Sequence, residues 1–415
     1  MKSEWTIKLL SEIADLNPRE SISKGVMAKK ISMDMLQLHC RDVSAYEVRP
    51  FTGGTKFRNG DTIMARITPC LENGKIAKVN VLDKDEVGFG STEYIVFRAK
   101  EGLSDPNFIY YLVCSPIVRE PAIKSMVGSS GRQRVQTDVI KKLEVLVPSL
   151  DEQHKIAGIL KALDDKIELN NKINKNLEEQ AVLLFRSMFT QTDSFSDNQL
   201  IESDFGCIPS TYKVVKAGDL PLLITDYVAN GSFASLKENV TLYQEKNYAY
   251  FIRNTDLKAD SFGVFVDKHS YDFLAKSTLY GGEIIISNVG DVGSVFLCPI
   301  LDRPMTLGNN MIMLRSQQPE LQYFLYVWFK WSYGQGLIQG IKGGSAQPKF
   351  NKTDFRNLPI MLPPESVLHE YHTAVSPMFS MIANNKSENS RLIGIRDSIL
   401  PKLMSGELDV SNVDL

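Results

Sequence analysis

Cysteine is scarce in this sequence, and its spacing suits neither a disulfide framework nor a metal site. The 415 residues include five cysteines, and none forms a C-x-x-C pair: Cys40, Cys70, Cys114, Cys207 and Cys298. The five histidines form no cluster at ligand spacing either. This pattern excludes a disulfide scaffold, predicts no structural metal and indicates a reducing compartment.

Long apolar segments are also missing. The start, MKSEWTIKLL, lacks the apolar core of a secretory signal, and no run of 18 apolar residues occurs anywhere. We therefore expect a soluble, cytoplasmic protein without membrane contact.

The usual motifs of nucleotide and methyl-transfer enzymes do not occur. No G-x-x-x-x-G-K-[ST] loop is present, and Pro363-Pro364 is followed by Glu365 where an amino-methyltransferase loop has an aromatic residue. Gln347-Pro348-Lys349 resembles half of a nuclease motif, but no acidic residue shortly precedes it. The sequence predicts a non-enzymatic chain with no catalytic residues, no metal and no cofactor of its own.

Charge of one sign is not in excess overall. Lys and Arg number 47 and Asp and Glu 49, so a generally cationic nucleic-acid binder is excluded and any such role needs a local patch. Residues 1–150 carry 22 Lys and Arg against 18 Asp and Glu, and the excess is concentrated between residues 119 and 142. That segment is the first place to seek a polyanion contact.

The sequence does contain a tandem duplication of roughly 200 residues. A shift of 215 maps Pro106–Leu112 onto Leu321–Val327 and Val147–Pro148 onto Leu362–Pro363. Upstream the shift changes to 222, where FRNGDTIMARI matches LYGGEIIISNV, and to 207 near the start of each half. Each half therefore opens and closes alike and diverges in its middle.

Each half combines strand and helix signals. Ile63–Ile67 and Ile284–Val289 read as buried strands, and Tyr94–Phe97 and Met311–Leu314 as a second matched pair. Asp105-Pro106 predicts a helix start with an N-cap and a first-turn proline. The prediction is an α+β fold with two tandem α/β domains.

A long amphipathic helix closes each half. Apolar residues and asparagines follow 4-3-4-3 spacing in both copies, which is typical of a helix-pairing seam. Antiparallel pairing with pseudo-twofold symmetry is favoured, while parallel pairing, or two helices packed only on their own domains, are alternatives. The predicted pairing residues are Ile156, Leu160, Leu163, Ile167, Asn170, Asn174, Leu177, Ile382, Asn385, Asn389 and Leu392.

The domain boundaries follow from these signals. We predict domains over residues 1–150 and 191–365, a central helix over 151–190, and a C-terminal helix and tail over 366–415.

Two Gly/Ser-rich loops with basic and amide side chains occupy matching positions. They are VGSSGRQRVQ (127–136) and IKGGSAQPKFNK (341–352). Glycine lets a backbone approach a phosphate closely, and Arg, Gln and Asn are readers of base edges. A solvated loop leading into a strand is the alternative interpretation of each.

Together these segments resemble the specificity subunit of type I restriction-modification systems. The resemblance rests on LVPSLDEQHKIAGILKALDDKIELNNKIN (146–174), YKVVKAGDL (212–220), GEIIISNVGDVG (282–293) and GGSAQPKFNKTDFRNLPIMLPP (343–364). The second copy departs from it at His369-Glu370, where Glu-Gln would be expected.

The resemblance implies two target-recognition domains that each read half of a split, asymmetric site in double-stranded DNA. It also implies an antiparallel spacer-helix pair that docks two modification subunits, which bind S-adenosylmethionine and methylate adenine. Restriction subunits that use ATP and Mg can join them.

Segments that are alike in two domains that read different DNA sequences cannot carry the code, that is, the residues that decide which bases each domain recognises. We therefore expect the loops at 128–134 and 343–349 to grip phosphates and the code to lie near 24–58, 70–92, 226–270 and 288–310. Arg66 and Asn288 match at the shift of 222 and suit guanine and adenine. The predicted DNA-binding residues are Arg66, Lys75, Arg132, Gln133, Arg134, Asn288, Lys342, Gln347 and Lys349. The competing hypothesis is a coiled-coil adaptor whose two domains bind proteins.

Overall fold

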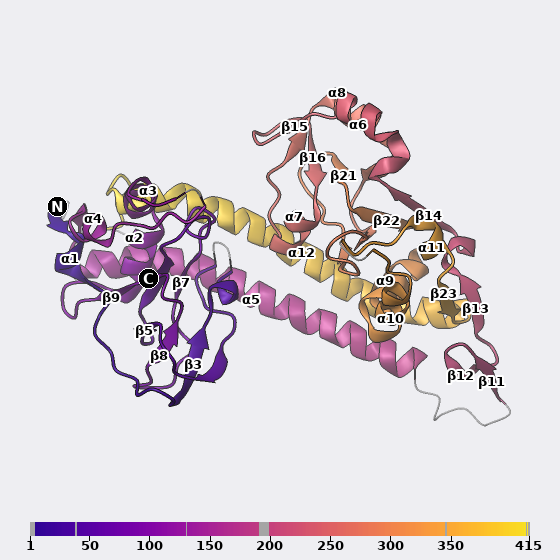
Figure 1. Ribbon diagram of the computed structural model, residues 1–415, viewed down its shortest axis with the longest axis horizontal. Helices are drawn as coiled ribbons and strands as arrows, with labels where there is room; N and C mark the ends of the chain where they lie inside the picture. Colours follow the sequence, from indigo (N-terminus) through magenta and orange to yellow (C-terminus); the bar gives the residue numbers. More distant parts are fainter. Residues whose placement is uncertain are drawn as a thin grey trace. The chain divides into compact units, whose positions relative to one another are not determined.

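The computed structural model describes residues 5–37, 40–129, 131–190, 199–344, 347–411 and 413 (Figure 1). The chain forms two compact units, Met1–Leu169 with Asn389–Leu415 and Asn170–Glu388. The boundary falls within two 40-residue helices, α5 (Leu150–Phe189) and α12 (Glu365–Met404). Each long helix therefore contributes to both units.

A four-stranded antiparallel sheet divides the first unit into two cores. Its strands are, in spatial order, β2 (Ala14–Leu16), β9 (Tyr94–Ala99), β6 (Thr62–Ala65) and β7 (Ile76–Lys78). Side chains alternate across a strand, so Met64 and Ile95 enter the larger core while Ile63 and Val96 enter the smaller one. Both central strands are consequently apolar on both faces.

The larger core of this unit is closed by helices and by a two-stranded ribbon. Phe108 and Leu112 of α2 share that core with Ile156 and Leu160 of α5. The ribbon pairs β1 (Thr6–Leu9) with β10 (Glu144–Val147), directly before α5. The helices are α1 (Leu10–Ile13), α2 (Pro106–Cys114), α3 (Pro116–Lys124) and α4 (Thr137–Lys141).

The smaller core of this unit lies against a second sheet. This sheet contains, in order, β4 (Glu47–Pro50), β3 (Met27–Ile31), β8 (Gly88–Gly90) and β5 (Thr55–Phe57). The β3–β8 pair is parallel and the other two pairs are antiparallel. The segments 24–58 and 70–92, where the code was predicted, supply all four of these strands.

The second unit repeats this topology. Its first sheet is β14 (Leu222–Asp226), β22 (Met311–Ser316), β19 (Ile284–Ser287) and β20 (Val295–Leu297), and its ribbon pairs β13 (Lys213–Lys216) with β23 (Pro359–Leu362). Its second sheet is β15 (Leu242–Tyr243), β17 (Phe265–Val266), β16 (Ala249–Ile252), β21 (Met305–Leu307) and β18 (Thr278–Leu279). The pair β16–β21 is parallel, like β3–β8. The middle segments of the two halves thus share a topology that their sequences do not reveal.

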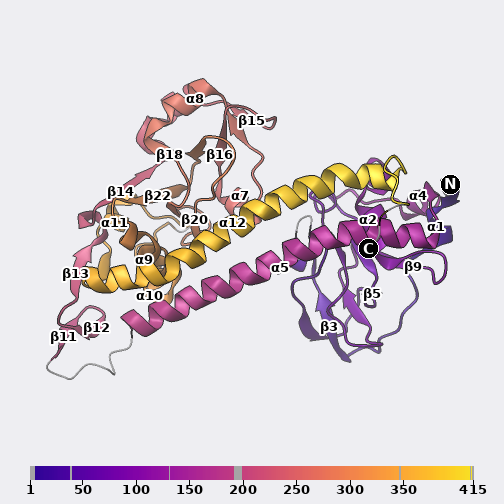
Figure 2. The ribbon, with the colours of Figure 1, turned by 180° about the vertical axis from the view of Figure 1, so that it is seen from behind.

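The helices of the second unit also match those of the first, with two additions. α9 (Pro319–Lys330) packs between the first sheet and the long helices, since Phe324 and Trp328 share a core with Leu314 and Tyr371 (Figure 2). The other matched helices are α10 (Ser332–Gly340) and α11 (Lys352–Arg356), while α7 (Asn254–Ala259) follows β16 where the first unit has a 3-10 turn, Met33–Met35, after β3. Relative to the first unit, α6 (Phe233–Asn239), α8 (Lys268–Phe273), β15 and the hairpin of β11 (Leu200–Ser203) and β12 (Gly206–Pro209) are additional.

The predicted helix start at Asp105 is present. The Asp105 carboxylate accepts from the backbone N–H groups of Asn107 and Phe108, and Pro106 occupies the first turn of α2. Three of the four unsatisfied N–H groups of a helix start are therefore either capped or absent.

α5 and α12 pair antiparallel within each unit. In the first unit, Arg396 of α12 donates to Asp164 of α5 at 2.8 Å. In the second, Asn385 donates to Asn174 at 2.8 Å and the Tyr371 hydroxyl donates to the Ala181 carbonyl at 3.1 Å. Residue numbers fall along α12 as they rise along α5, which defines the antiparallel direction.

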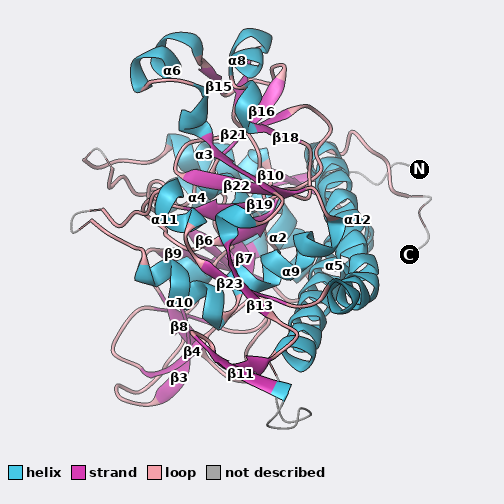
Figure 3. Cartoon of the chain, turned by 90° about the vertical axis from the view of Figure 1, so that its right-hand side faces the viewer, coloured by secondary structure: helices cyan, strands magenta, loops and turns pink. Residues whose placement is uncertain are grey.

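The predicted fold class, a mixed α/β protein with a long helix between its two domains, is confirmed. Figure 3 shows the mixture of helices and strands. Within the described residues, no helix has the length and apolar character needed to cross a membrane. The same residues contain no cluster of three or more His, Cys, Asp or Glu side chains able to hold a metal ion.

Candidate nucleic-acid interface

In the first unit, three separate segments meet at the end of strand β6. The N–H of Arg66, the residue after β6, donates to the Glu93 carbonyl at 2.9 Å, and the Arg66 carbonyl accepts from Val135 at 2.8 Å. The Thr68 N–H donates to the Gln133 carbonyl at 3.0 Å. These three main-chain hydrogen bonds fix the strand end, the turn before β9 and the loop at 127–135 relative to one another; we call this arrangement the frame.

The second unit builds the same frame from the matching residues. The Asn288 N–H donates to the Asn310 carbonyl at 3.1 Å, and the Asn288 carbonyl accepts from Phe350 at 3.0 Å. The Gly290 N–H donates to the Pro348 carbonyl at 2.9 Å. The two predicted loops therefore occupy equivalent places, and the predicted match of Arg66 with Asn288 extends to their backbone partners.

Glycine in both loops serves the loop itself. Gly128 has a φ of +136° and Gly344 a φ of +87°, a region that favours glycine. A Cβ added to Gly128 would lie 2.9 Å from the Arg132 carbonyl oxygen, and one on Gly344 would lie 2.6 Å from that of Gln347. The turn geometry accounts for both residues without a phosphate. Ser130, Ser345 and Ala346 lie outside the described residues.

Glu93 lies between two of the predicted DNA-binding arginines. Arg134 Nε donates to both Glu93 carboxylate oxygens at 3.0 Å, and Arg134 Nη2 donates to Oε1 at 2.7 Å. Arg66 Nε is 3.9 Å from Glu93 Oε2. The hydrogen bonds from Arg134 lower the pKa of Glu93 and outweigh the opposing effect of partial burial. Sequence reasoning missed Glu93, although the alignment of Ser91–Tyr94 with Gly308–Met311 would have paired it with Asn310.

The remaining predicted residues of the first unit differ in their surroundings. Arg132 is exposed, and its side chain makes no hydrogen bond or ion pair with any residue that the structure describes. Gln133 is half-buried and contributes its carbonyl to the frame. Lys75 Nζ donates to the Met33 carbonyl at 2.7 Å, so this ammonium group is engaged inside the unit.

In the second unit, Gln347, Lys349 and Lys342 are exposed, and Lys342 donates to the Gln339 side chain at 3.2 Å. The Asn288 amide faces the protein, because its Nδ2 donates to the Phe350 carbonyl at 3.4 Å and its Oδ1 is buried without a partner among the described residues. Bidentate adenine readout by Asn288 thus requires its side chain to rotate.

The predicted helix-pairing residues divide between the two units. Ile156 and Leu160 are fully buried in the core of the first unit, and Ile382 packs against the core of the second. Asn170 donates to Glu388 at 2.7 Å, close to the Asn174–Asn385 contact. Asn389 is buried, whereas Leu163, Ile167, Leu177 and Leu392 are half-buried.

A buried polar network that the sequence did not predict joins α5, α12 and α2 in the first unit. The Asp164 carboxylate accepts from the Tyr111 hydroxyl at 2.7 Å and from Arg396 at 2.8 Å. Burial and the neighbouring carboxylate raise the pKa of Tyr111 well above its ordinary range, so its hydroxyl keeps its proton and donates. The matching residues in the second unit are Tyr326, Phe379 and Ala181, where an aromatic contact between Tyr326 and Phe379 replaces the Tyr111–Asp164 hydrogen bond.

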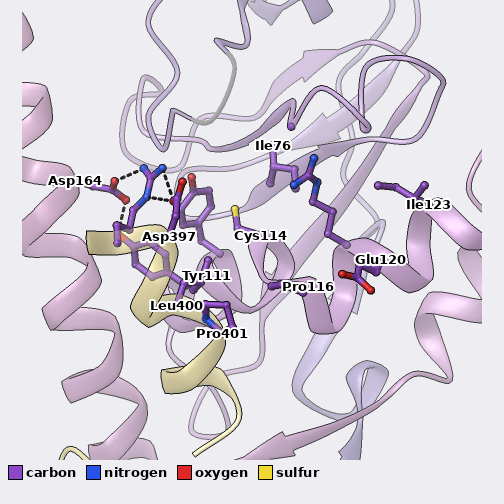
Figure 4. Close-up of a pocket in the computed structure, with 14 residues that line it drawn as sticks. Ile76, Tyr111, Cys114, Pro116, Glu120, Ile123, Asp164, Asp397, Leu400 and Pro401 are labelled. Atoms are coloured by element: carbon purple, nitrogen blue, oxygen red, sulfur yellow. Dashed lines mark hydrogen bonds and ion pairs between the residues drawn. The ribbon is translucent and has the colours of Figure 1, made fainter. Parts of the chain in front are cut away.

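This network borders a pocket of about 410 Å³ in the first unit. In Figure 4, Asp164, Asp397 and Tyr111 gather at one side of the pocket, and Glu120 and Ile123 lie at the other. Leu400 and Pro401 of α12 complete its wall. The polar groups near Asp164 are bonded to one another, so the pocket presents mainly apolar surface.

Comparison with known proteins identifies the family. The family model described as the type I restriction modification DNA specificity domain matches residues 2–179 and 209–392. The specificity subunit of the type I restriction enzyme MjaIX of Methanocaldococcus jannaschii is 29% identical over 318 residues, which cover 74% of this chain and 70% of the relative. The specificity subunit of the HindI enzyme of Haemophilus influenzae is 24% identical over 434 residues, which cover 89% and 91%.

A solved structure shares the fold. The S subunit of a type I restriction-modification system from M. genitalium matches with a TM-score of 0.55 and 17% identity, and the match covers 97% of this chain and 96% of that one. Because the family model matches both halves of the sequence, and both halves fold alike, the chain belongs to the family of type I restriction-modification specificity subunits.

Proposed function

We propose that this chain is the non-catalytic DNA-recognition subunit of a cytoplasmic type I restriction-modification complex. Each frame contacts one half of a bipartite, asymmetric site in double-stranded DNA. The observation that supports this most directly is that the two frames have the same main-chain hydrogen bonds but different polar side chains. A repeated scaffold with different side chains is what an asymmetric two-part target requires.

The predicted domain boundaries assign a role to each part of the chain. Residues 1–150 and 191–365 form the two target-recognition domains, and residues 151–190 and 366–415 contribute the spacer helices. The helix pair docks two modification subunits, which hold S-adenosylmethionine and methylate adenine. Restriction subunits that use ATP and Mg join this core.

Exposed cations on the two loops are the predicted phosphate contacts. Arg132 in the first unit and Lys342 and Lys349 in the second are all exposed. Neutralising a phosphate releases condensed counterions, so affinity for duplex DNA falls as salt rises. An adaptor that binds only proteins through these domains would lack this dependence. Titration of the full chain, assembled with its modification subunits, against a duplex at several salt concentrations separates the two functions.

A domain exchange tests the assignment of each half. Residues 1–150 are replaced by the equivalent domain of another specificity subunit, and N6-methyladenine is mapped in DNA from cells carrying the complete modification complex. We expect one half of the methylated sequence to change and the other to persist, because each unit has its own cores. A change in both halves would show that the two domains do not read the DNA independently. Deleting the gene should abolish the mapped methylation, and methylation that persists without the gene would contradict the proposed function.

A further inference from the structure

The two frames differ in chemistry where their backbones agree. Arg134 and Lys349 occupy equivalent loop positions, and the carbonyls of Glu93 and Asn310 accept equivalent hydrogen bonds from the strand end. Only the first unit therefore combines a guanidinium with a carboxylate at these two positions. A difference confined to side chains on a common backbone is where sequence preference can reside.

Glu93 holds Arg134 by one edge. The Nε and Nη2 groups donate to the carboxylate, which leaves the edge formed by Nη1 and the second N–H of Nη2 without a partner among the described residues. The Arg134 side chain is 45% exposed, so this second edge reaches solvent. A guanidinium held on one side presents a fixed pair of donors on the other.

The charge of this cluster argues against a simple phosphate grip. Arg66, Arg134 and Glu93 together carry a net charge of +1, because the lowered pKa of Glu93 keeps its carboxylate ionised. A carboxylate next to a phosphate repels it, whereas a guanine edge presents two neutral acceptors, O6 and N7, which match a fixed guanidinium edge. Arg132, in the same loop but without a carboxylate, keeps its full charge for phosphate.

Building on the proposed function, we propose that Arg134 reads a guanine in the half-site of the first unit and that Glu93 is the residue that positions it. In the second unit, Lys349 has no planar fork and Asn310 has no charge, so the same contact does not form there. The guanine contact is therefore specific to one half of the target.

Replacing Arg134 by Lys is the main test, because it keeps the charge and removes the fork. The full chain is assembled with its modification subunits, and the methylated sequence is mapped in cells. We expect one guanine position of the first half-site to become degenerate. In binding assays, affinity for the preferred duplex should fall about 5- to 150-fold, whereas affinity for an unrelated duplex should stay within about twofold. Arg19→Lys makes the same exchange at an exposed arginine of this unit outside the frame, so it is the matched control and should change neither the methylated sequence nor the two affinities.

Glu93→Gln tests the positioning role. Loss of the carboxylate charge frees Arg134 for phosphate, so affinity for unrelated DNA should rise while the ratio of preferred to unrelated binding falls. Glu101→Gln removes the same charge from an exposed side chain of the same unit, outside the segments predicted to carry the code, and should leave that ratio unchanged. Unaltered thermal melting of all four variants excludes unfolding as the cause.

The outcomes separate this inference from the proposed function. If Arg134→Lys weakens preferred and unrelated binding by the same factor, or leaves the methylated sequence intact, Arg134 does not read a base and the inference is overturned. If the wild-type complex itself prefers no sequence, the proposed function fails, and this inference fails with it.

Discussion

Arg396 and Asp164 form an ion pair across the antiparallel helices of the first unit, with an Nη1–Oδ1 distance of 2.8 Å and side-chain exposures of 9% and 4%. The equivalent positions of the second unit hold Ala181 and Phe379, which lie together in its apolar core. The same helix contact is thus ionic in one copy of the duplication and apolar in the other.

Removing one partner of this pair should destabilise the first unit strongly. In Asp164→Ala, the buried Arg396 and Tyr111 lose their shared acceptor, and we expect a loss of about 3–5 kcal/mol in the free energy of unfolding. Urea unfolding of the variant measures this loss. Lys175→Ala, which breaks an exposed pair with Glu179, is the control and should change stability little.

An apolar replacement of the whole network distinguishes packing from charge. The triple variant Tyr111→Phe, Asp164→Leu and Arg396→Met should recover most of the stability that Asp164→Ala loses, because no buried polar group then lacks a partner. A triple variant as unstable as Asp164→Ala would show that the ion pair itself, and not the avoidance of an unpaired charge, stabilises this contact.

Arg132 should contribute to DNA affinity without contributing to sequence preference. We expect Arg132→Ala to weaken binding to all duplexes by a similar factor and to reduce the slope of log affinity against log salt by about one. Salt titrations with preferred and unrelated duplexes measure both effects. A shift in the methylated sequence would assign Arg132 to base reading instead.

Under the proposed function, lengthening the helix pair should widen the gap of unspecified base pairs between the two halves of the DNA site. Asn174–Asn385 and Ala181–Tyr371 fix the register on either side of Asn176, so a heptad inserted after Asn176 needs a second one after Ile382. The matched insertion adds about 10 Å to each helix, which corresponds to roughly three base pairs of duplex. We expect both halves of the methylated sequence to persist with a gap wider by about one to three base pairs.

The matched insertion has its own control. The heptad after Asn176 alone breaks the register of one contact and should impair assembly. An unchanged gap in an active complex with both insertions would show that the helices do not set the spacing.

The thiols of Cys207 and Cys298 should react at very different rates. Cys207 is exposed, whereas Cys298 is buried, and burial raises the pKa of the Cys298 thiol well above its ordinary value of 9.0. Because the thiolate is the reactive form, an aromatic disulfide reagent at pH 8 should modify Cys207 quickly and Cys298 only after unfolding. Mass spectrometry of the modified chain measures this order.

The sign of the pH effect at Cys298 follows from the same shift. The unfolded chain loses the thiol proton near pH 9.0 and the folded chain only at higher pH, so this group lowers stability as pH rises above 9.0. Unfolding measured on Cys298→Ala should therefore show a weaker loss of stability over that range than the wild type. An identical pH dependence would contradict the burial of this thiol.

The sequence predicts the features that depend on local pattern. The heptad spacing marks both long helices, and Asp105-Pro106 marks the start of α2, because periodicity and capping are properties of neighbouring residues. The shared topology of the two middle sheets escapes prediction, since β3 pairs with β8 and β16 with β21 across long, dissimilar connections. The buried network around Asp164 could not be predicted for a related reason, because it depends on Tyr111 and Arg396, which are distant in sequence.

The candidate site was predictable in its parts but not in its assembly. Arg66 and Arg134 stand out by residue type, and the duplication pairs them with Asn288 and Lys349. Glu93 joins them only because a strand end, a turn and a loop converge in space. An isolated glutamate before a strand carries no signal of that role.

Each frame depends on main-chain groups that nearly every amino acid possesses. Substitutions at Arg66 or Arg134 thus keep these main-chain hydrogen bonds, provided that proline, which lacks the N–H, is avoided at both positions, since the Arg134 N–H donates to the Val127 carbonyl at 2.9 Å. Position 310 is more restricted, because its φ of +64° suits Asn, Asp or Gly. Under the proposed function, a few point mutations at these positions should therefore change the recognised DNA sequence and leave the folding intact, and a small codon library at these positions would test this directly.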